Sequence, residues 1–469
     1  MKKSVEKGDY NHDHIPQLKE KALKTSIKEG TSASISTSIG DNYVIPFAVA
    51  LGAQPGQASL LSGLSGFMYY LSQLFGTRMM EKYSRKKIVM SFVLLQAIMW
   101  LFIAIAGVLV WKGVFDGYSV WLLIIFYSLL LFFGGISYPS WFSWMGDIVP
   151  ADGKGEYFGR RTRINAFFGL AALLAAMFFL DYYKTKGIVL LAFAILFALA
   201  FTFRFISYLL FHKQYVPQFK AKKRDRFSLW AFLKRYDNFG KFAVYHGFFN
   251  LAVMFASPLF AVYMLKELGF SYKFYTLTLV SYMIFYLVFL PLAGKFSDRY
   301  GNKRLMIITN VFFALTPVLY ILIKNPMGII LLPQLSSGIA SAASVISFSN
   351  FIYDAVSPKH RAICVTYTNI MIGIGTLVGA LLGWAVIDYL HPASINPYIF
   401  VFIIAAVLRG GVALFFLPQI KEVRKVKRLP TQYDLLFHPL HFMHHEGIKL
   451  VHLPEKVLGK FKSLKLLHV

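Results

Sequence analysis

Long apolar runs separated by short polar connections recur from about residue 30 to residue 418. A helix needs about 20 mainly apolar residues to cross the hydrocarbon layer of a membrane. On that length the pattern predicts twelve membrane-spanning helices, which we place at residues 30–52, 58–79, 88–111, 118–146, 162–181, 187–211, 239–264, 273–294, 305–324, 327–353, 362–388 and 396–418. A hydrophobic content of 57% and a mean hydropathy of +0.56 agree with this pattern. The predicted fold class is an all-α polytopic membrane protein.

Basic residues are distributed unevenly between the two sets of alternating connections. Lys and Arg number 49 against 22 Asp and Glu, and 41 of them fall in or beside the N-tail, every second connection and the C-tail, against six on the other side. Short connections rich in Lys and Arg remain on the cytoplasmic side of a membrane. We therefore expect a multi-pass plasma-membrane protein with both termini cytoplasmic. Anionic lipid, and no nucleic acid, is the expected partner of this charge.

The two halves of the chain resemble each other. Asp147 and Asp354 lie 207 positions apart, and Arg204 precedes Arg409 by 205. Internal repeats of this kind are common in secondary transporters. The predicted organisation is a cytoplasmic N-tail at 1–29, six-helix bundles at 30–211 and 239–418, a cytoplasmic central loop at 212–238, and a cytoplasmic amphipathic C-tail at 419–469.

One charged turn between two predicted helices carries a specific pattern. The stretch from Gly294 to Arg304 reads Gly-x-x-x-Asp-Arg-x-Gly-x-Lys-Arg, with the acid at Asp298 and the second glycine at Gly301. A glycine suits a turn position of positive φ, and the basic residues can stay in water beside lipid headgroups. The pattern resembles the signature loop of the major facilitator superfamily (MFS), found between helices 2 and 3 and again between helices 8 and 9.

The resemblance implies two pseudo-symmetric six-helix bundles that rock about a central site near the bilayer midplane. It further implies that Asp298 pairs with a basic group or with the start of helix 11 and holds the cytoplasmic side closed. The other gating candidates on this loop are Arg299, Gly301, Lys303 and Arg304. The matching loop of the first half is degenerate, and its gating candidates are Glu81, Arg85 and Lys86.

Two further charge pairs follow helices 4 and 10. Asp147 precedes Lys154 by seven positions, and Asp354 precedes Arg361 by the same interval. These resemble acidic–basic pairs of the superfamily, and such ion pairs can form in one conformation and break in the other. The alternative interpretation is that they are topology-determining charges at helix ends.

Ionisable residues inside membrane helices are costly, so each one is a functional candidate. Asp41 lies within Ser38-Ile-Gly-Asp-Asn-Tyr43, next to Asn42 and ahead of Pro46. It is a candidate for proton coupling, with a structural or substrate-binding acid as the alternative. His246 and Asn250 are four positions apart on helix 7 and form a second candidate pair, with a solvated histidine near the helix end as the alternative.

Further candidates are structural or aromatic. Arg204 and Arg409 occupy matching places in helices 6 and 12, which favours an intramembrane structural role. Aromatic and amide side chains that can line a substrate cavity are Tyr138, Trp141, Asn165, Asn350 and Asn369. Aromatic residues near helix ends are alternatively interface anchors.

The expected function is secondary active transport of a small solute by alternating access, with protons as the coupling ion and drug or metabolite efflux as one form of it. No phosphate-binding loop or catalytic motif is present, so we expect neither an enzyme nor a cofactor or metal requirement. A monomer is expected. Two alternatives stay open: a lipid-handling translocase, and a non-transporting scaffold or sensor that retains the fold.

Overall fold

The computed structural model describes residues 15–114, 117–150, 154–217, 232, 234, 237–424 and 426. The predicted C-tail helix and most of the central loop lie outside these residues. The first six helical passes are α1 (Ile15–Ile39) continued by η2 (Asp41–Tyr43) and α2 (Val44–Ala50), α3 (Pro55–Met79), α4 (Arg85–Trp111), α5 (Ser119–Ile148), α6 (Lys154–Thr185) and α7 (Val189–His212). The next six are α9 (Asn238–Met254) with α10 (Ser257–Val262) and η4 (Tyr263–Glu267), α11 (Tyr272–Tyr300), α12 (Asn302–Leu322), α13 (Pro326–Ala355), α14 (Pro358–Ala385) with η5 (Val386–Leu390), and α15 (Pro397–Phe416).

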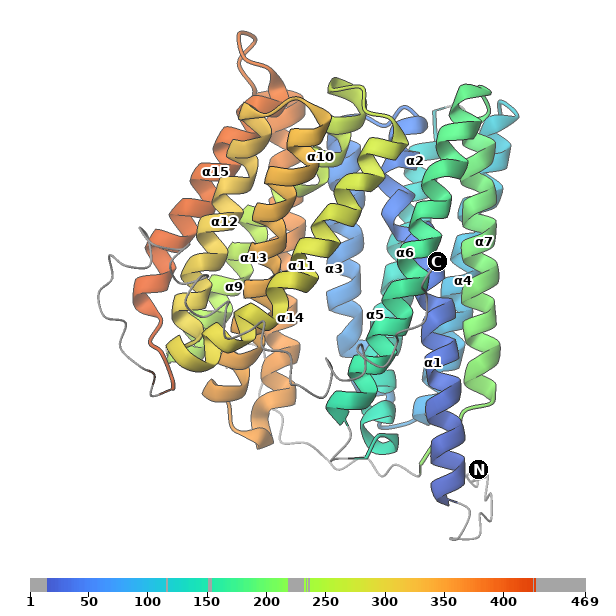
Figure 1. Cartoon of the computed structure of the whole chain (residues 1–469), viewed down its shortest axis with the longest axis vertical. Helices are drawn as coiled ribbons and strands as arrows, with labels where there is room; N and C mark the ends of the chain where they lie inside the picture. Colours follow the sequence, from blue (N-terminus) through green and yellow to red (C-terminus); the bar gives the residue numbers. More distant parts are fainter. Residues whose placement is uncertain are drawn as a thin grey trace, which may run out of the picture.

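Ten passes among the described residues are long and apolar enough to cross a membrane by length and composition. The other two are α1 with α2, and α3; both are richer in small and polar residues and run beside the other helices (Figure 1). The prediction of an all-α polytopic protein with twelve helices in two bundles is confirmed.

The first helix begins earlier than the sequence suggested. The N-tail was expected to extend to residue 29, whereas α1 is helical from Ile15. Its buried positions recur every three or four residues and are mostly small and polar: Ala22, Ser26, Glu29, Ser32 and Ser36. This spacing places them on one face, which packs against α6 and α7. Small polar residues carry little hydrophobic signal, so hydropathy places the start of the helix too late.

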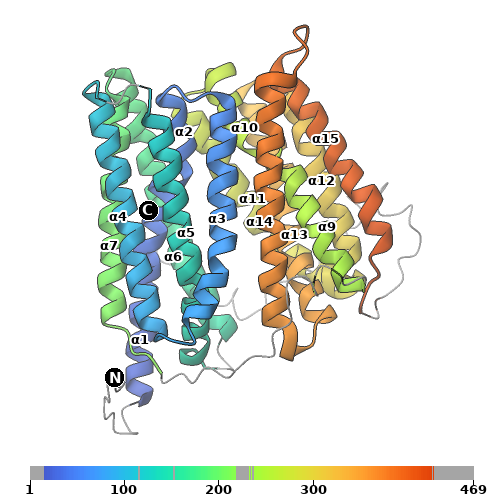
Figure 2. The same ribbon diagram turned by 180° about the vertical axis from the view of Figure 1, so that it is seen from behind.

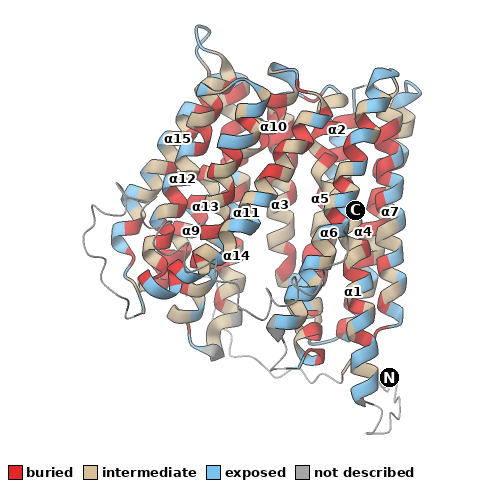
Figure 3. Cartoon of the chain, in the orientation of Figure 1, coloured by how far each residue is buried: buried red, intermediate tan, exposed pale blue. Residues whose placement is uncertain are grey.

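The helices form two groups of six that lie side by side (Figures 1 and 2). We call the end at which α1 begins, with the described connecting residues 80–84, 149–150, 213–217 and 356–357, the basic end. The groups come together at the opposite end, near α2 and α10, and diverge towards the basic end. Buried residues lie mainly on the packed faces of the helices, and many exposed residues lie on the outer surface and the connections (Figure 3).

Contacts between the two groups are concentrated away from the basic end. The Tyr43 and Thr276 hydroxyls lie 3.0 Å apart, and Lys266 Nζ donates to the Ala53 carbonyl at 2.5 Å. Helix α3 packs along α14, where Gly63 lets Ala380 approach closely. Many of these contacts use small side chains or backbone groups, so they permit close helix packing.

The first and seventh passes are both interrupted, and a proline explains each interruption. Pro46 has no N–H, so it cannot bond to the carbonyl four residues back, that of Asn42. The Tyr275 hydroxyl from the other half donates to that free carbonyl at 3.1 Å. Pro258 likewise follows the break between α9 and α10. The two broken helices therefore expose backbone groups that other elements use.

Glycines on α14 control its packing against α9, and they generate a stability prediction. A Cβ on Gly379 would overlap the backbone of Leu251, whereas one on Gly410 of α15 would meet nothing within 4 Å. We expect Gly379→Ala to lower the free energy of unfolding by about 1–3 kcal/mol. Gly410→Ala, the matched control, should be neutral or slightly stabilising because alanine favours helix. Thermal unfolding in detergent measures both, and equal melting temperatures would refute this account of the α9–α14 contact.

Candidate functional site

A charge cluster closes the basic end of the first half. Arg85, the first residue of α4, is buried and donates from Nη1 to Asp147 Oδ2 at 2.7 Å and to the Ser143 carbonyl at 2.9 Å. Its Nη2 donates to the Pro217 carbonyl at 3.3 Å, just after α7. Lys86 donates to the carbonyls of His212 and Gln214. We call this set the first charge cluster; it joins α4, α5 and the segment after α7.

A second charge cluster occupies the matching place in the other half. Asp354 accepts from Arg424 Nε at 2.6 Å and from Asn302 Nδ2 at 2.8 Å. Asp298 Oδ1 lies 3.3 Å from Arg424 Nη1, and its side chain is 75% exposed. The hydrogen bond to Asp354 raises the pKa of the Arg424 guanidinium above its ordinary value. Arg424 therefore bridges both acids that the sequence singled out in this half.

The two clusters obtain their positive charge from different places. Asn302 opens α12 as Arg85 opens α4, and both bond to the penultimate residue of a neighbouring helix. An asparagine cannot supply a charge, so in the second half Arg424, beyond the last helix, provides the guanidinium. The sequence pattern did not single out Arg424, because its role depends on contacts between distant parts of the chain.

The segment after α15 also binds the turn at Gly301. Gly301 has φ +93°, a conformation that favours glycine, and separates α11 from α12. Glu422 Oε2 accepts from the Lys303 backbone N–H at 2.8 Å, at the start of α12. A carboxylate is favourable there because the start of a helix presents unpaired N–H groups and a positive dipole end. Ile420 is fully buried and anchors the segment.

The remaining gating candidates have local contacts. The Arg299 guanidinium lies over the Tyr300 ring at 5.3 Å, and Arg304 donates to the Tyr300 carbonyl. Glu81 is exposed in the turn after α3. Their gating role stays a prediction.

The expected partner of Asp354 differs from the observed one, and the expected partner of Asp147 is outside the described side chains. Arg361 donates to the carbonyls of Tyr353 and Val356 and lies 4.8 Å over the Tyr353 ring, whereas Asp354 pairs with Arg424. Lys154 begins α6, but its side chain is outside the described part, and Asp147 pairs with Arg85. The seven-residue spacing therefore does not give the ion pair of Asp354 in this conformation, and a pair between Asp147 and Lys154 stays a prediction.

Asp41 lies at the interruption of the first pass, as expected. The hydroxyls of Tyr127 and Thr37 are within hydrogen-bonding reach of its carboxylate, and its Oδ1 is buried with no partner among the described residues. Asn42 donates from its side chain to the Ser38 carbonyl and, through its own carbonyl, accepts from Tyr275. The acid is therefore one residue away from a contact between the two halves.

A buried acid that the sequence analysis did not select lies deeper in the first half. Glu29 is 4% exposed at its side chain; Oε2 lies 3.2 Å from Arg161 Nη2, and Oε1 accepts from Ser207 at 2.9 Å. Arg204 also interacts with Glu29 electrostatically and donates to the Gln96 side chain. Residue 29 was assigned to the tail, so this group was missed. The interval of three and four residues between buried positions of α1 was the signal that could have revealed it.

The corresponding interior of the second half contains no ion pair among the described residues. Arg409 donates to the carbonyls of Ala252, Val253 and Phe313 at 2.8–3.2 Å. Those carbonyls partly come from the interruption of the seventh pass, which agrees with the expected structural role. His246 packs against the Phe348 ring, with centroids 4.3 Å apart, and its Nδ1 is buried without a partner. Its backbone carbonyl accepts from Asn250.

The aromatic and amide candidates separate into three places. Tyr138 and Trp141 stack on α5, and the Arg161 guanidinium lies 4.9 Å from the Trp141 ring centroid. Asn165 accepts from Thr31 of α1 at 3.2 Å, on the same side as Arg161. Asn350 donates to Ser297 near the second charge cluster. Asn369 donates to Gln73 at 2.9 Å and joins the two halves.

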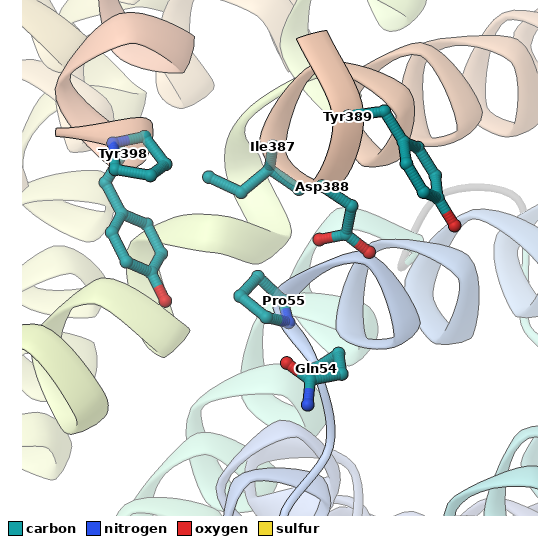
Figure 4. Close-up of a pocket in the computed structure, with 7 residues that line it drawn as sticks. Gln54, Pro55, Ile387, Asp388, Tyr389 and Tyr398 are labelled. Atoms are coloured by element: carbon teal, nitrogen blue, oxygen red, sulfur yellow. The ribbon is translucent and has the colours of Figure 1, made fainter. Parts of the chain in front are cut away.

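A separate pocket of about 390 Å³ opens at the end opposite the basic end (Figure 4). Gln54 and Pro55 approach it from the start of α3, and Ile387, Asp388 and Tyr389 from the end of the eleventh pass. Asp388 accepts from Trp384 Nε1 at 2.7 Å. None of the predicted site residues lines this pocket, which lies on the side where the two groups of helices meet.

Twelve helical passes in two similar halves define a polytopic all-α membrane protein. The sequence profile of the Major Facilitator Superfamily matches residues 31–262 and 242–463, and the chain belongs to this family.

Curated relatives match over part of their length. The chain is 28% identical over 153 residues to vacuolar basic amino acid transporter 1 of Saccharomyces cerevisiae, covering 32% of this chain and 27% of that protein. It is 25% identical over 199 residues to multidrug resistance protein 1 of Bacillus subtilis, covering 41% of this chain and 49% of that protein. The matches thus span about a quarter to a half of these relatives.

Solved structures share the fold. An auto-inhibited peptide transporter of the POT family superimposes with a TM-score of 0.68 at 14% identity, over 87% of this chain and 98% of that one. A mutant of the nucleoside transporter NupG gives 0.64 at 17% identity, over 86% and 100%. A bacterial homologue of the lysosomal transporter Spinster, in an inward-facing conformation, gives 0.59 at 14% identity, over 88% and 99%.

The equivalence of the two charge clusters can be tested by moving the guanidinium of the second cluster from position 424 to position 302. Arg424→Ala should lower the free energy of unfolding by about 1 kcal/mol, because it leaves the largely buried carboxylate of Asp354 without its cation. Adding Asn302→Arg should restore stability, because Arg85 makes the equivalent bond in the first half. Lys421→Ala is the control, since only the backbone of Lys421 pairs with Asn238. Thermal unfolding in detergent reports all three, and a double variant less stable than Arg424→Ala would contradict the proposed equivalence.

Proposed function

We propose that this protein is a secondary active transporter that moves a small solute across the plasma membrane by alternating access, with protons as the coupling ion. The basic end is then cytoplasmic, in accordance with the positive-inside distribution of Lys and Arg. The divergence of the two groups towards that end corresponds to a conformation open to the cytoplasm (Figure 1). The protein acts as a monomer in contact with anionic lipid on its cytoplasmic face.

The position of Asp41 carries the coupling proposal. This carboxylate lies in the three-residue turn η2, whose other two residues both bond to α11 of the second half. A change in its charge alters the hydration and hydrogen bonding of the turn, and therefore the contact that holds the outer side together. His246 packs among aromatic rings of its own half. The geometry thus favours Asp41 over His246 as the coupling group.

The two charge clusters are the second part of the proposed alternating-access mechanism. Each holds the basic end of one half as a rigid unit, since each ties the end of one helix to the start of another. In the conformation open to the outside, the exposed carboxylates of Asp298 and Asp147 become available to the opposite half. The names of two relatives, multidrug resistance proteins 1 and 3 of Bacillus subtilis, favour efflux as the direction of transport.

Replacement of Asp41 tests the coupling. A solute is first chosen because it stabilises the purified protein in a thermal-shift screen. The protein is then reconstituted into proteoliposomes, the solute is added outside, and its accumulation inside is measured with and without a proton gradient. Asp41→Asn cannot change its charge, so gradient-driven accumulation should fall at least about tenfold while solute exchange without a gradient persists.

Asp181→Asn is the matched control, because Asp181 lies near the end of α6, away from the interruption of the first pass. Gradient-driven transport in Asp41→Asn that equals that of the wild type would remove Asp41 from the mechanism.

A further inference from the structure

Arg161 of the first half lies over an indole ring and uses only some of its hydrogen-bond donors. Arg161 lies two turns into α6 from the basic end, and its guanidinium lies 4.9 Å from the Trp141 ring centroid on α5. Its Nη2 lies 3.2 Å from Glu29, and its Nε donates to the Ser26 carbonyl at 3.3 Å. The ion pair and the indole together fix the plane of the guanidinium.

Arg161 retains donor capacity after these contacts. A guanidinium carries five N–H donors, and within the described residues only Nε and Nη2 have acceptors. Nη1 has no hydrogen bond there, and it is not among the fully buried atoms that lack a partner, so part of its surface stays accessible. A fixed guanidinium edge of this kind is suited to two oxygens of a carboxylate or sulfonate.

A second donor lies beside it. Asn165 is four positions after Arg161 and therefore on the same face of α6. Its Oδ1 accepts from Thr31, which orients its Nδ2 away from that bond. A Cβ on Gly30 of α1 would overlap the Arg161 guanidinium and lie 2.6 Å from Asn165 Nδ2. Both donors thus pack side by side against the backbone of Gly30, where any side chain would displace them.

An apolar surface adjoins these donors. Trp141 stacks with Tyr138, and Tyr138 stacks with Phe142; the last two are 45% and 59% exposed. The Tyr138 phenol interacts electrostatically with Tyr353 of α13, so this surface faces the second half of the protein. Offset stacking favours a planar aromatic group against such rings.

The local charge favours an anion. Glu29 is enclosed behind Arg161, with 4% of its side chain exposed against 14% for Arg161. Glu29 also faces Arg204, and Arg204 in turn faces Asp41. Arg161 is the more exposed member of its own ion pair in this interior of two acids and two arginines. The group that an incoming molecule meets is therefore positive, and the negative partner lies behind it.

We propose that Arg161, Asn165, Trp141 and Tyr138 bind a planar aromatic anion, with its carboxylate or sulfonate on the two donors and its ring on the aromatic surface. This substrate class rests on the proposed transport function.

Binding of three matched probes to the purified full-length protein tests this substrate class. Naphthalenesulfonate, naphthalenesulfonamide and naphthylmethylammonium share one ring system and differ in charge, and equilibrium dialysis in detergent measures their binding. The sulfonate should bind at least about tenfold more tightly than the other two, because a bond between charged groups is stronger than a neutral one. Tighter binding of the ammonium probe, equal binding of all three, or no binding of the sulfonate overturns the proposal.

Variants locate the bound anion. Arg161→Gln and Trp141→Leu should each weaken sulfonate binding about tenfold or more, and Gly30→Ala should weaken it by displacing both donors. Arg163→Gln is the matched control, because Arg163 is exposed on the same helix and donates to the Gly159 carbonyl. The double variant Glu29→Gln with Arg161→Gln removes one charge of each sign and leaves Arg204 its bond to Gln96, and its melting temperature, measured beside binding, separates loss of binding from a folding defect. Unchanged sulfonate binding in that double variant overturns the assignment.

Dialysis separates this proposal from the transport proposal. Sulfonate binding that is not followed by movement in proteoliposomes contradicts transport and leaves the binding site intact. Transport of another solute, with sulfonate binding absent, contradicts the site and leaves transport intact.

Discussion

The cost of an unsatisfied charge or backbone group inside a membrane determines much of this structure. Arg409 has no carboxylate partner in the described part of the chain, and its guanidinium is satisfied by carbonyls near the break that precedes Pro258. The break and the arginine therefore depend on each other: without the arginine the carbonyls lose a donor, and without the break the arginine loses acceptors. In the first half the same requirement is met by Tyr275, which crosses from the other half to the carbonyl freed by Pro46.

The two halves share a fold but differ in their interior chemistry. The first half contains two acids and two arginines in its interior, and the second contains Arg409 and a cluster of aromatic rings around His246. The two halves therefore have the same architecture, but the interior of the first contains an ion pair and that of the second is mainly packed aromatic rings. The contact between them runs through α3 and α14, where small residues allow close approach, and through η2, where the neighbours of Asp41 bond to α11.

The sequence predicted the twelve passes, the two halves and the turn at Gly301, because membrane length, charge distribution and repeat spacing are local or periodic signals. It did not predict the partners of the acids. Arg424 meets Asp354 only because the chain returns after its last helix, and Arg161 meets Glu29 only because α1 begins at Ile15. Both depend on tertiary contacts between segments of ordinary composition.

The origin of the positive charge in each cluster has a consequence for biosynthesis. Arg85, Asp147 and the Pro217 carbonyl are all synthesised before the second half begins, so the first charge cluster can assemble while translation continues. The second cluster requires Arg424, which leaves the ribosome after all the helices that the structure describes. The second half is therefore the later one to reach its final packing. A chain shortened just after α15 would keep the residues of all twelve passes and lack the bridge that Arg424 forms between Asp298 and Asp354.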